Sequence, residues 1–319
     1  MPKSLRWLAV ALTLLGAVRA QAQPDEPPLN LIVAAAAGSA PDIIARVLGD
    51  ELRTRLGQTT VVDNKAGAGG IVAVMATKTA ASPNTLLLAH AAVVTVTPLT
   101  YRAARYDLAT DMEPVVVVAD TPMLFVANAA DGPKTLAQAI AAAKARPGEV
   151  ALTTTARGSI PNLSAEILAQ ASGARFNIIP MGNSGQAIQA VINGDSLVSV
   201  DGIAPLLPLV KAGRLRALAV TAPRPLPGLE GIPLAQDTVP GLQATGWFVL
   251  FAKKGTPPGR IQQINAAVNA ALQAPEVQHK LASTANFPVG GSVADASAFV
   301  QREKALWAAA VQRAGLKPE

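Results

Sequence analysis

The sequence predicts an α/β protein that folds into two lobes. Short apolar runs typical of buried strands alternate with helical patterns along the 319 residues, and the alternation starts again near residue 136. Continuous apolar strands between amphipathic helices favour parallel sheets with both faces covered by helices. A chain of this length also supports two domains of roughly 100–200 residues each.

The expected strands are short and rich in Val, Ile and Leu, which suits a buried position in a sheet. The run from Trp247 to Phe251 is strongly β-like. In chain order the expected strands span residues 29–33, 60–63, 85–88, 114–118, 124–126, 150–154, 176–179, 197–200, 215–220 and 247–251.

The expected helices carry apolar residues three or four positions apart, as at Ile44, Val47 and Leu48. Glycine and proline end several of them, because neither residue continues a helix well. In chain order the expected helices span residues 42–56, 71–80, 136–144, 163–171, 184–192, 204–211, 260–272, 277–285 and 294–314.

A strand-like run late in the chain suggests that the chain returns to the sheet it began. We therefore expect two crossings between lobes, near residues 120–126 and 244–252. The first lobe would consist of residues 28–122 and 247–319, and the second of residues 123–246.

The first 22 residues have the pattern of a secretory signal peptide. Lys3 and Arg6 precede an apolar run over residues 8–18, and Ala20-Gln21-Ala22 offers small residues for cleavage. The run is about half the ~20 residues that a spanning helix needs. We therefore expect an exported, periplasmic protein cleaved near Ala22. Its net charge would fall from +6 to +3, with 24 basic and 21 acidic residues remaining.

Composition excludes several kinds of site. The chain has no cysteine, so it contains no disulfide, thiolate nucleophile or cysteine-based metal site. Its two histidines, His90 and His279, lie far apart in the sequence without a metal-binding motif. No basic stripe with interleaved aromatics suggests nucleic-acid binding. We expect no metal and no cofactor, and we expect a monomer.

A six-residue pattern occurs twice, 120 residues apart. It reads Gly-Ser-x-Pro, then Asp or Asn, then Ile or Leu, and it begins at Gly38 and at Gly158. Each copy follows an expected strand and opens an expected helix, where α/β folds bind ligands. Free backbone N–H groups at a helix start attract anions. Two such turns could hold one anion from both sides, although ordinary helix capping explains the same residues.

Several segments in order resemble the substrate-binding proteins of tripartite tricarboxylate transporters, the Bug-type extracytoplasmic receptors. The resemblance runs from Leu29 to Pro318. Its segments are GQTTVVDNKAGAGG at 57–70, ARPG at 145–148, KAGRLRALAVT at 211–221, VPG at 239–241, GTPP at 255–258 and AGLKP at 314–318.

The resemblance implies two Rossmann-like lobes, a small carboxylate ligand in the cleft between them, and delivery to a pair of membrane permease subunits. It also implies that the loop after the first strand and the matching loop of the second lobe hold the carboxylate. A sensory receptor of the same fold, which contacts a membrane sensor kinase, fits equally well. We do not expect an enzyme: an exported hydrolase would need a base beside Ser39 or Ser159, and neither serine lies in a G-x-S-x-G elbow.

The sequence departs from the family pattern where the ligand would lie. The first loop lacks the usual aromatic residue and one glycine, and the V-P-Y-K-G motif appears as Ile179-Pro180-Met181-Gly182-Asn183. An atypical ligand is therefore expected. The residues that we expect at the ligand are Gly38, Ser39, Asp42, His90, Thr154, Arg157, Gly158, Ser159, Asn162, Met181 and Asp201.

Alternatives stay open for most of these side chains. Arg157 could bind a carboxylate through two hydrogen bonds or could lie on the rim in solvent. The two serines could contact ligand or cap their helices, and Asp42 could accept from a ligand amine or water or serve as a cap. His90 and Asp201 follow strands and could be cleft or turn residues, whereas Met181 would form an apolar wall. Gly67-Ala68-Gly69-Gly70 is interpreted as a structural turn, and Trp247 as a hinge or core residue.

Overall fold

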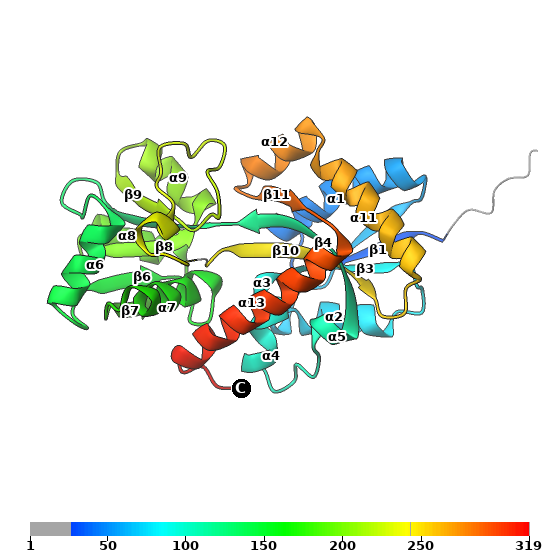
Figure 1. Ribbon diagram of the computed structural model, residues 1–319, viewed down its shortest axis with the longest axis horizontal. Helices are drawn as coiled ribbons and strands as arrows, with labels where there is room; N and C mark the ends of the chain where they lie inside the picture. The colour runs from blue at the N-terminus through cyan, green and yellow to red at the C-terminus, as the bar shows by residue number, and fades with distance from the viewer. Residues whose placement is uncertain (1–26, 243, 319) are drawn as a thin grey trace, which may run out of the picture.

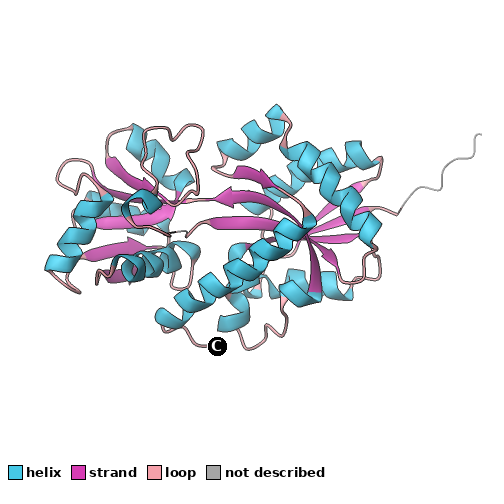
Figure 2. Cartoon of the chain, in the orientation of Figure 1, coloured by secondary structure: helices cyan, strands magenta, loops and turns pink. Residues whose placement is uncertain are grey.

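Two mixed β-sheets, one in each lobe, carry the fold (Figures 1 and 2). The computed structural model describes residues 27–242 and 244–318, so the expected signal peptide lies outside the described residues. The first sheet has the order β11-β4-β10-β3-β1-β2. Its strands are β1 (Leu29–Val33), β2 (Thr60–Asn64), β3 (Thr85–His90), β4 (Met112–Thr121), β10 (Gly246–Lys253) and β11 (Phe287–Gly290).

The second sheet has five strands in the order β7-β6-β8-β5-β9. Its strands are β5 (Met123–Asn128), β6 (Ala151–Thr154), β7 (Asn177–Pro180), β8 (Val198–Gly202) and β9 (Leu215–Val220). Each sheet thus contains a parallel unit of three strands whose carboxyl ends carry the loops toward the cleft. The predicted two-lobed α/β architecture is confirmed.

The expectation of parallel sheets holds for only part of each sheet. Strand β10 runs antiparallel to β3 and β4, β11 runs antiparallel to β4, and β5 runs antiparallel to β8 and β9. Strands β5 and β10 each enter their lobe from the crossover side. A strand that enters there must run away from the cleft, whereas the strands that carry the cleft loops run toward it.

Helices cover both faces of the first sheet. Apolar side chains of α1 (Ala40–Leu56), α11 (Pro258–Leu272) and α12 (Pro275–Ser283) form a core on one face. The opposite face is covered by α2 (Ile71–Thr79), α3 (Ala91–Thr95), α5 (Leu108–Asp111) and the first part of α13 (Val293–Arg313). Alternate residues of β1 explain this arrangement: Leu31 points into one core and Ile32 into the other.

The second sheet is covered in the same way. On one face lie α6 (Leu136–Ala145) and α7 (Ile160–Ser172), together with the last part of α13. On the other lie α8 (Ser184–Ile192) and α9 (Ile203–Lys211). Phe125 and Val126 of β5 point to opposite faces, which explains why this strand is apolar throughout.

Sequence periodicity did not predict the shortest elements. These are η1 (Ala68–Gly70), α3, α4 (Thr97–Thr100), α5, α10 (Ala235–Thr238) and β11. A single helical turn is too short to show a repeat of 3.6 residues. Strand β11 contains Pro288 and ends at Gly290, and it is an edge strand, where proline is tolerated.

Two crossovers and helix α13 join the lobes. Thr121, at the end of β4, pairs with Gly246, at the start of β10, so the crossovers lie side by side. Helix α13 runs diagonally from the first lobe to the second (Figure 1). Because α13 packs against both lobes, the boundaries at residues 122/123 and 246/247 stay a proposal.

One buried carboxylate ties the two lobes together along α13. Glu303 Oε2 accepts hydrogen bonds from Trp247 Nε1 at 2.8 Å and from Trp307 Nε1 at 3.0 Å. Trp247 belongs to a core of the first lobe and Trp307 to a core of the second. Within the described part of the chain, no helix is long and apolar enough to cross a membrane.

Candidate functional site

A cavity of about 690 Å³ lies where the two lobes meet. From the first lobe it is lined by His90, the last residue of β3, by residues that follow the carboxyl ends of β1, β2 and β3, and by Tyr101 after α4. From the second lobe it is lined by residues 156–159, between β6 and α7. The chain after α13 adds residues 315–317. The cavity thus lies where α/β folds bind ligands.

The repeated sequence pattern folds into two turns of the same kind. Gly38 has φ +79° and Gly158 has φ +76°, a conformation that glycine adopts without strain. The N–H of Gly38 donates to Asp42 Oδ2 at 2.8 Å, and the N–H of Gly158 donates to Asn162 Oδ1 at 2.9 Å. The Asp or Asn of the pattern is therefore the residue that fixes each turn from within.

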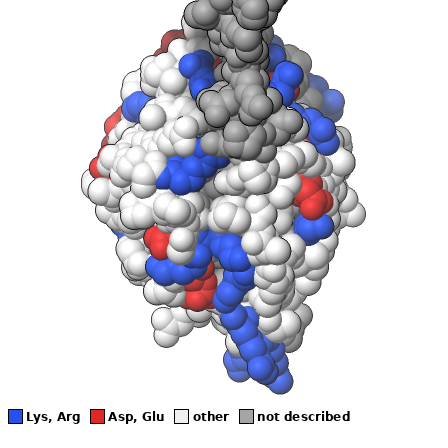
Figure 3. Space-filling model, turned by 90° about the vertical axis from the view of Figure 1, so that its right-hand side faces the viewer, with Lys and Arg blue, Asp and Glu red and all other residues white. Residues whose placement is uncertain are grey.

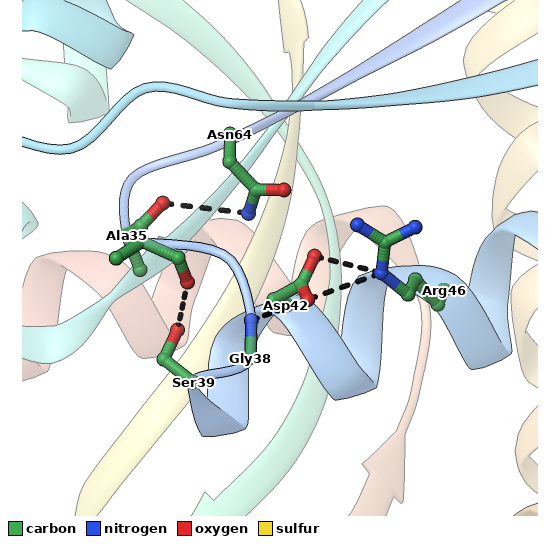
Figure 4. Close-up of polar contacts among 7 residues, drawn as sticks. Ala35, Gly38, Ser39, Asp42, Arg46 and Asn64 are labelled. Atoms are coloured by element: carbon green, nitrogen blue, oxygen red, sulfur yellow. Dashed lines mark hydrogen bonds and ion pairs between the residues drawn. The ribbon is translucent and has the colours of Figure 1, made fainter.

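In the first turn, Asp42 is a structural residue (Figure 4). Its buried carboxylate forms an ion pair with Arg46 at 3.0 Å. The hydrogen bond from Arg46, followed by that from Gly38, holds the pKa of Asp42 below its usual value. Ser39 precedes α1, but its hydroxyl donates to the carbonyl of Ala36 at 2.5 Å instead of capping the helix.

In the second turn, Ser159 caps α7. Its Oγ accepts from the N–H of Asn162 at 3.3 Å and pairs with the hydroxyl of Thr155 at 2.8 Å. Thr154 and Asn162 are buried beneath the turn, where the Asn162 amide donates to Thr154 Oγ1 at 3.3 Å. Ser159 thus serves as a cap and lines the cavity at once.

The Arg157 side chain lines the cavity and also reaches the end of α13. Its Nη2 donates to the carbonyl of Ala314 at 2.5 Å. An arginine suits this position because the last carbonyls of a helix lack partners within the helix. Glu166, on α7, is attracted to the same guanidinium. The remaining N–H groups of Arg157 can donate to a ligand, since a guanidinium carries five.

His90 is a neutral imidazole in the cavity wall. It ends β3, and burial lowers its pKa to about 4. Its ring stands edge-on to Phe248 with centroids 6.5 Å apart. At neutral pH it can offer one N–H donor and one acceptor to a ligand.

Several residues that the sequence placed at the ligand do not line this cavity. They are Gly38, Ser39, Asp42, Thr154, Asn162, Met181 and Asp201. Met181 donates its N–H to the carbonyl of Thr154, and Asp201 accepts from the N–H of Gly202 at 2.7 Å. Burial raises the pKa of Asp201. Of the two turns, only the second reaches the cavity wall, so the structure does not show one anion gripped by both.

Sequence reasoning missed several parts of the wall, among them residues 96–101 around α4. The segment 66–70, interpreted as a structural turn, lines the cavity through Gly67, Gly69 and Gly70. A Cβ at Gly70 would lie 2.5 Å from Val93, so a close approach requires glycine there. Its position after β2, at the carboxyl edge of the sheet, was the available signal. Residues 315–317 were missed as well.

Positive charge is not confined to the cavity. Lys and Arg side chains also gather on the end of the first lobe, with fewer Asp and Glu between them (Figure 3). Some cations of this lobe are paired, as in Lys78 with Asp111 and Lys254 with Glu113, both at 2.8 Å. A net positive surface raises the local concentration of anions and is screened by salt.

The sequence model of the family described as tripartite tricarboxylate transporter family receptor matches residues 44–316 of this chain. The chain belongs to this family. It is 34% identical to Protein BugT of Bordetella pertussis over 293 residues, which cover 91% of this chain and 90% of the relative.

Solved structures of similar proteins include two with a bound acid. R. palustris Rpa4515 with adipate is 29% identical, with a TM-score of 0.72 over 92% of this chain and 98% of that one. MatC from Rhodopseudomonas palustris with bound malate is 25% identical, with a TM-score of 0.66 over 89% and 99%.

Proposed function

We propose that this receptor captures a small carboxylate in the cavity between its lobes and passes it to permease subunits in the membrane after export to the periplasm. The observation that carries the proposal is the charge of the cavity wall. Arg157 and Lys317 line it, and among the residues that the structure describes no Asp or Glu does. The adipate and malate bound by the two related proteins support the same ligand class.

Side chains, more than backbone, would hold the carboxylate. The N–H groups of Gly158, Ser159 and Asn162 already donate within the second turn. The remaining N–H groups of the Arg157 guanidinium and the positive end of the α7 dipole are open to an anion. Charge-assisted hydrogen bonds of this kind contribute about 1.5–3 kcal/mol each.

Binding without chemical conversion fits these contacts. The Ser159 hydroxyl is occupied by Thr155 and by the Asn162 N–H, and in the described chain no hydrogen bond joins it to His90. A nucleophilic serine needs a base within hydrogen-bond reach. We therefore assign the cavity a receptor role, in which two lobes close on the ligand and the closed form is favoured by binding.

A thermal-shift screen tests the proposal. The mature chain is mixed with mono-, di- and tricarboxylates, aromatic acids and amino acids, and we expect a carboxylate to raise the melting temperature. In Ala156→Trp the indole would fill part of the cavity, because Ala156 lies exposed in its wall. This variant should lose the shift, whereas Ala204→Trp, on the exposed surface of α9, should keep it. A shift that survives Ala156→Trp unchanged would place the ligand elsewhere.

A further inference from the structure

The chain after α13 lies across both lobes. At its start, the carbonyl of Ala314 accepts from Arg157, in the second lobe, at 2.5 Å. At its end, the carbonyl of Pro318 accepts from Arg102 Nε, in the first lobe, at 3.2 Å. The segment 314–318, called here the C-terminal segment, is thus held at both ends beside the cavity.

An apolar contact fixes the middle of the C-terminal segment. Leu316 packs against a core of the second lobe. A Cβ built on Gly158 would lie 3.3 Å from Leu316 Cδ1, so the glycine of the second turn leaves room for this side chain. Because the residues on both sides are held, the backbone of Lys317 has a defined position in the cavity wall.

The two cations of the cavity differ in their partners. Arg157 is hydrogen-bonded to Ala314 and attracted to Glu166. Lys317 is exposed, and no hydrogen bond or ion pair joins it to another described residue. An ammonium that has no partner among the described residues, on a flexible four-carbon stem, can meet an anion that enters the cavity.

The distance between the cations suits a short diacid. A Cβ on Gly315 would lie 3.8 Å from Arg157 Nη2, and Lys317 follows two residues later. Two residues span at most about 7 Å along the chain. One carboxylate at Arg157 therefore leaves the other end of a short diacid within reach of the Lys317 ammonium.

We propose that Lys317 is a specificity-determining residue, which supplies the second positive charge for a ligand with two carboxylates. This inference rests on the proposed function, since it assigns the cavity to carboxylates. It adds that the C-terminal segment, and not only the two lobes, selects among them.

Calorimetric titration of the full mature chain with two probes tests the inference. Adipate carries two carboxylates, and hexanoate has the same chain length with one. Lys317→Gln should weaken adipate binding about tenfold, which corresponds to about 1.4 kcal/mol, and should leave hexanoate binding unchanged. Lys317→Arg should retain most of the adipate affinity. The matched control is Lys211→Gln, an exposed lysine at the end of α9 outside the cavity wall, which should change neither affinity.

The outcomes separate the two claims. The inference is overturned if Lys317→Gln weakens both probes equally, if it weakens neither, or if Lys211→Gln has the same effect. If the wild-type chain binds neither probe nor any other acid of the screen, the proposed function fails together with the inference. Equal melting temperatures of wild type and Lys317→Gln would show that a loss of affinity is not a loss of fold.

Discussion

At the scale of single residues, Arg157 can have two partners, the carbonyl of Ala314 and a ligand anion. The sequence indicated a carboxylate anchor or a solvent-exposed rim residue, and the structure places the guanidinium in the cavity wall with one hydrogen bond to the carbonyl of Ala314. The contact with Ala314 could not be predicted, because it joins residues 157 positions apart. Arg157 thus positions the C-terminal segment and remains able to bind an anion.

Replacing Arg157 by alanine should affect binding more than folding. We expect Arg157→Ala to weaken adipate binding by one to two orders of magnitude, from the loss of about 1.5–3 kcal/mol. Unfolding free energy should fall by only about 1 kcal/mol, because the residue is exposed. Calorimetry and urea denaturation measure the two quantities. An unchanged adipate affinity would remove Arg157 from the ligand site.

His90 should make the protein less stable in mild acid. Burial lowers its pKa to about 4 in the folded chain, against about 6.5 when unfolded. As the pH falls below 6.5, the unfolded chain takes up the proton first, so stability decreases between pH 6.5 and pH 4. At pH 5 this loss is on the order of 2 kcal/mol. His90→Gln should lose less stability than wild type between pH 7.5 and pH 5.

The comparison with His90→Gln is needed because protonation of Asp120 changes the unfolding free energy in the opposite direction. Burial raises the pKa of Asp120 to about 6, so the folded chain takes up that proton first and gains stability as the pH falls through 6. Urea denaturation of both proteins at the two pH values isolates the histidine. If wild type and variant lost the same unfolding free energy, His90 would be solvated and its pKa would not be lowered by burial.

At the scale of elements, the two turns show what a sequence repeat can and cannot predict. The repeat predicted that both turns would have the same form, and the glycine φ values and N–H contacts confirm it. It assigned Asp42 and Asn162 to the ligand, whereas both point inward to fix their turns. A short polar side chain after a glycine serves either role, so the pattern alone does not distinguish them.

Exchanging Asn162 for aspartate tests how near the bound anion lies to the second turn. Asn162→Asp should keep the turn, because Asp42 accepts from Gly38 in the same way. It places a buried negative charge beneath the cavity, where Glu166 stands in place of the cation that pairs with Asp42, so adipate affinity should fall several-fold and the melting temperature should fall as well. Asn183→Asp, which keeps the cap of α8 outside the cavity wall, is the matched control. Unchanged adipate affinity in Asn162→Asp would place the anion away from the second turn.

The longer helices and strands could be predicted from the sequence, but the direction of some strands in the sheets could not. Helices such as α1 and α13 showed clear periodicity, and buried strands such as β4 were unbroken apolar runs. The direction of β5 and β10 depends on which lobe the chain comes from, and local sequence does not carry that information.

At the scale of the whole molecule, the lobes meet at the paired crossovers, at α13 and at the C-terminal segment, and Arg224 of the second lobe also pairs with Asp120 and donates to the carbonyl of Pro288 in the first. The crossovers contain Thr121 and Gly246, which pair directly. Glu303 binds a tryptophan from each lobe's core, so α13 is anchored on both sides. The proposed closure on a ligand would bend the crossovers while the C-terminal segment keeps contact with the cavity.

The central claim is that the cavity between the lobes holds a carboxylate and leaves it chemically intact. A crystal structure of the mature chain grown with adipate, or with the acid that gives the largest thermal shift, tests it most directly. We predict electron density for the unaltered acid between Arg157 and the His90 wall, with one carboxylate on the guanidinium. Density for the acid outside this cavity, or for a converted product within it, would contradict the account.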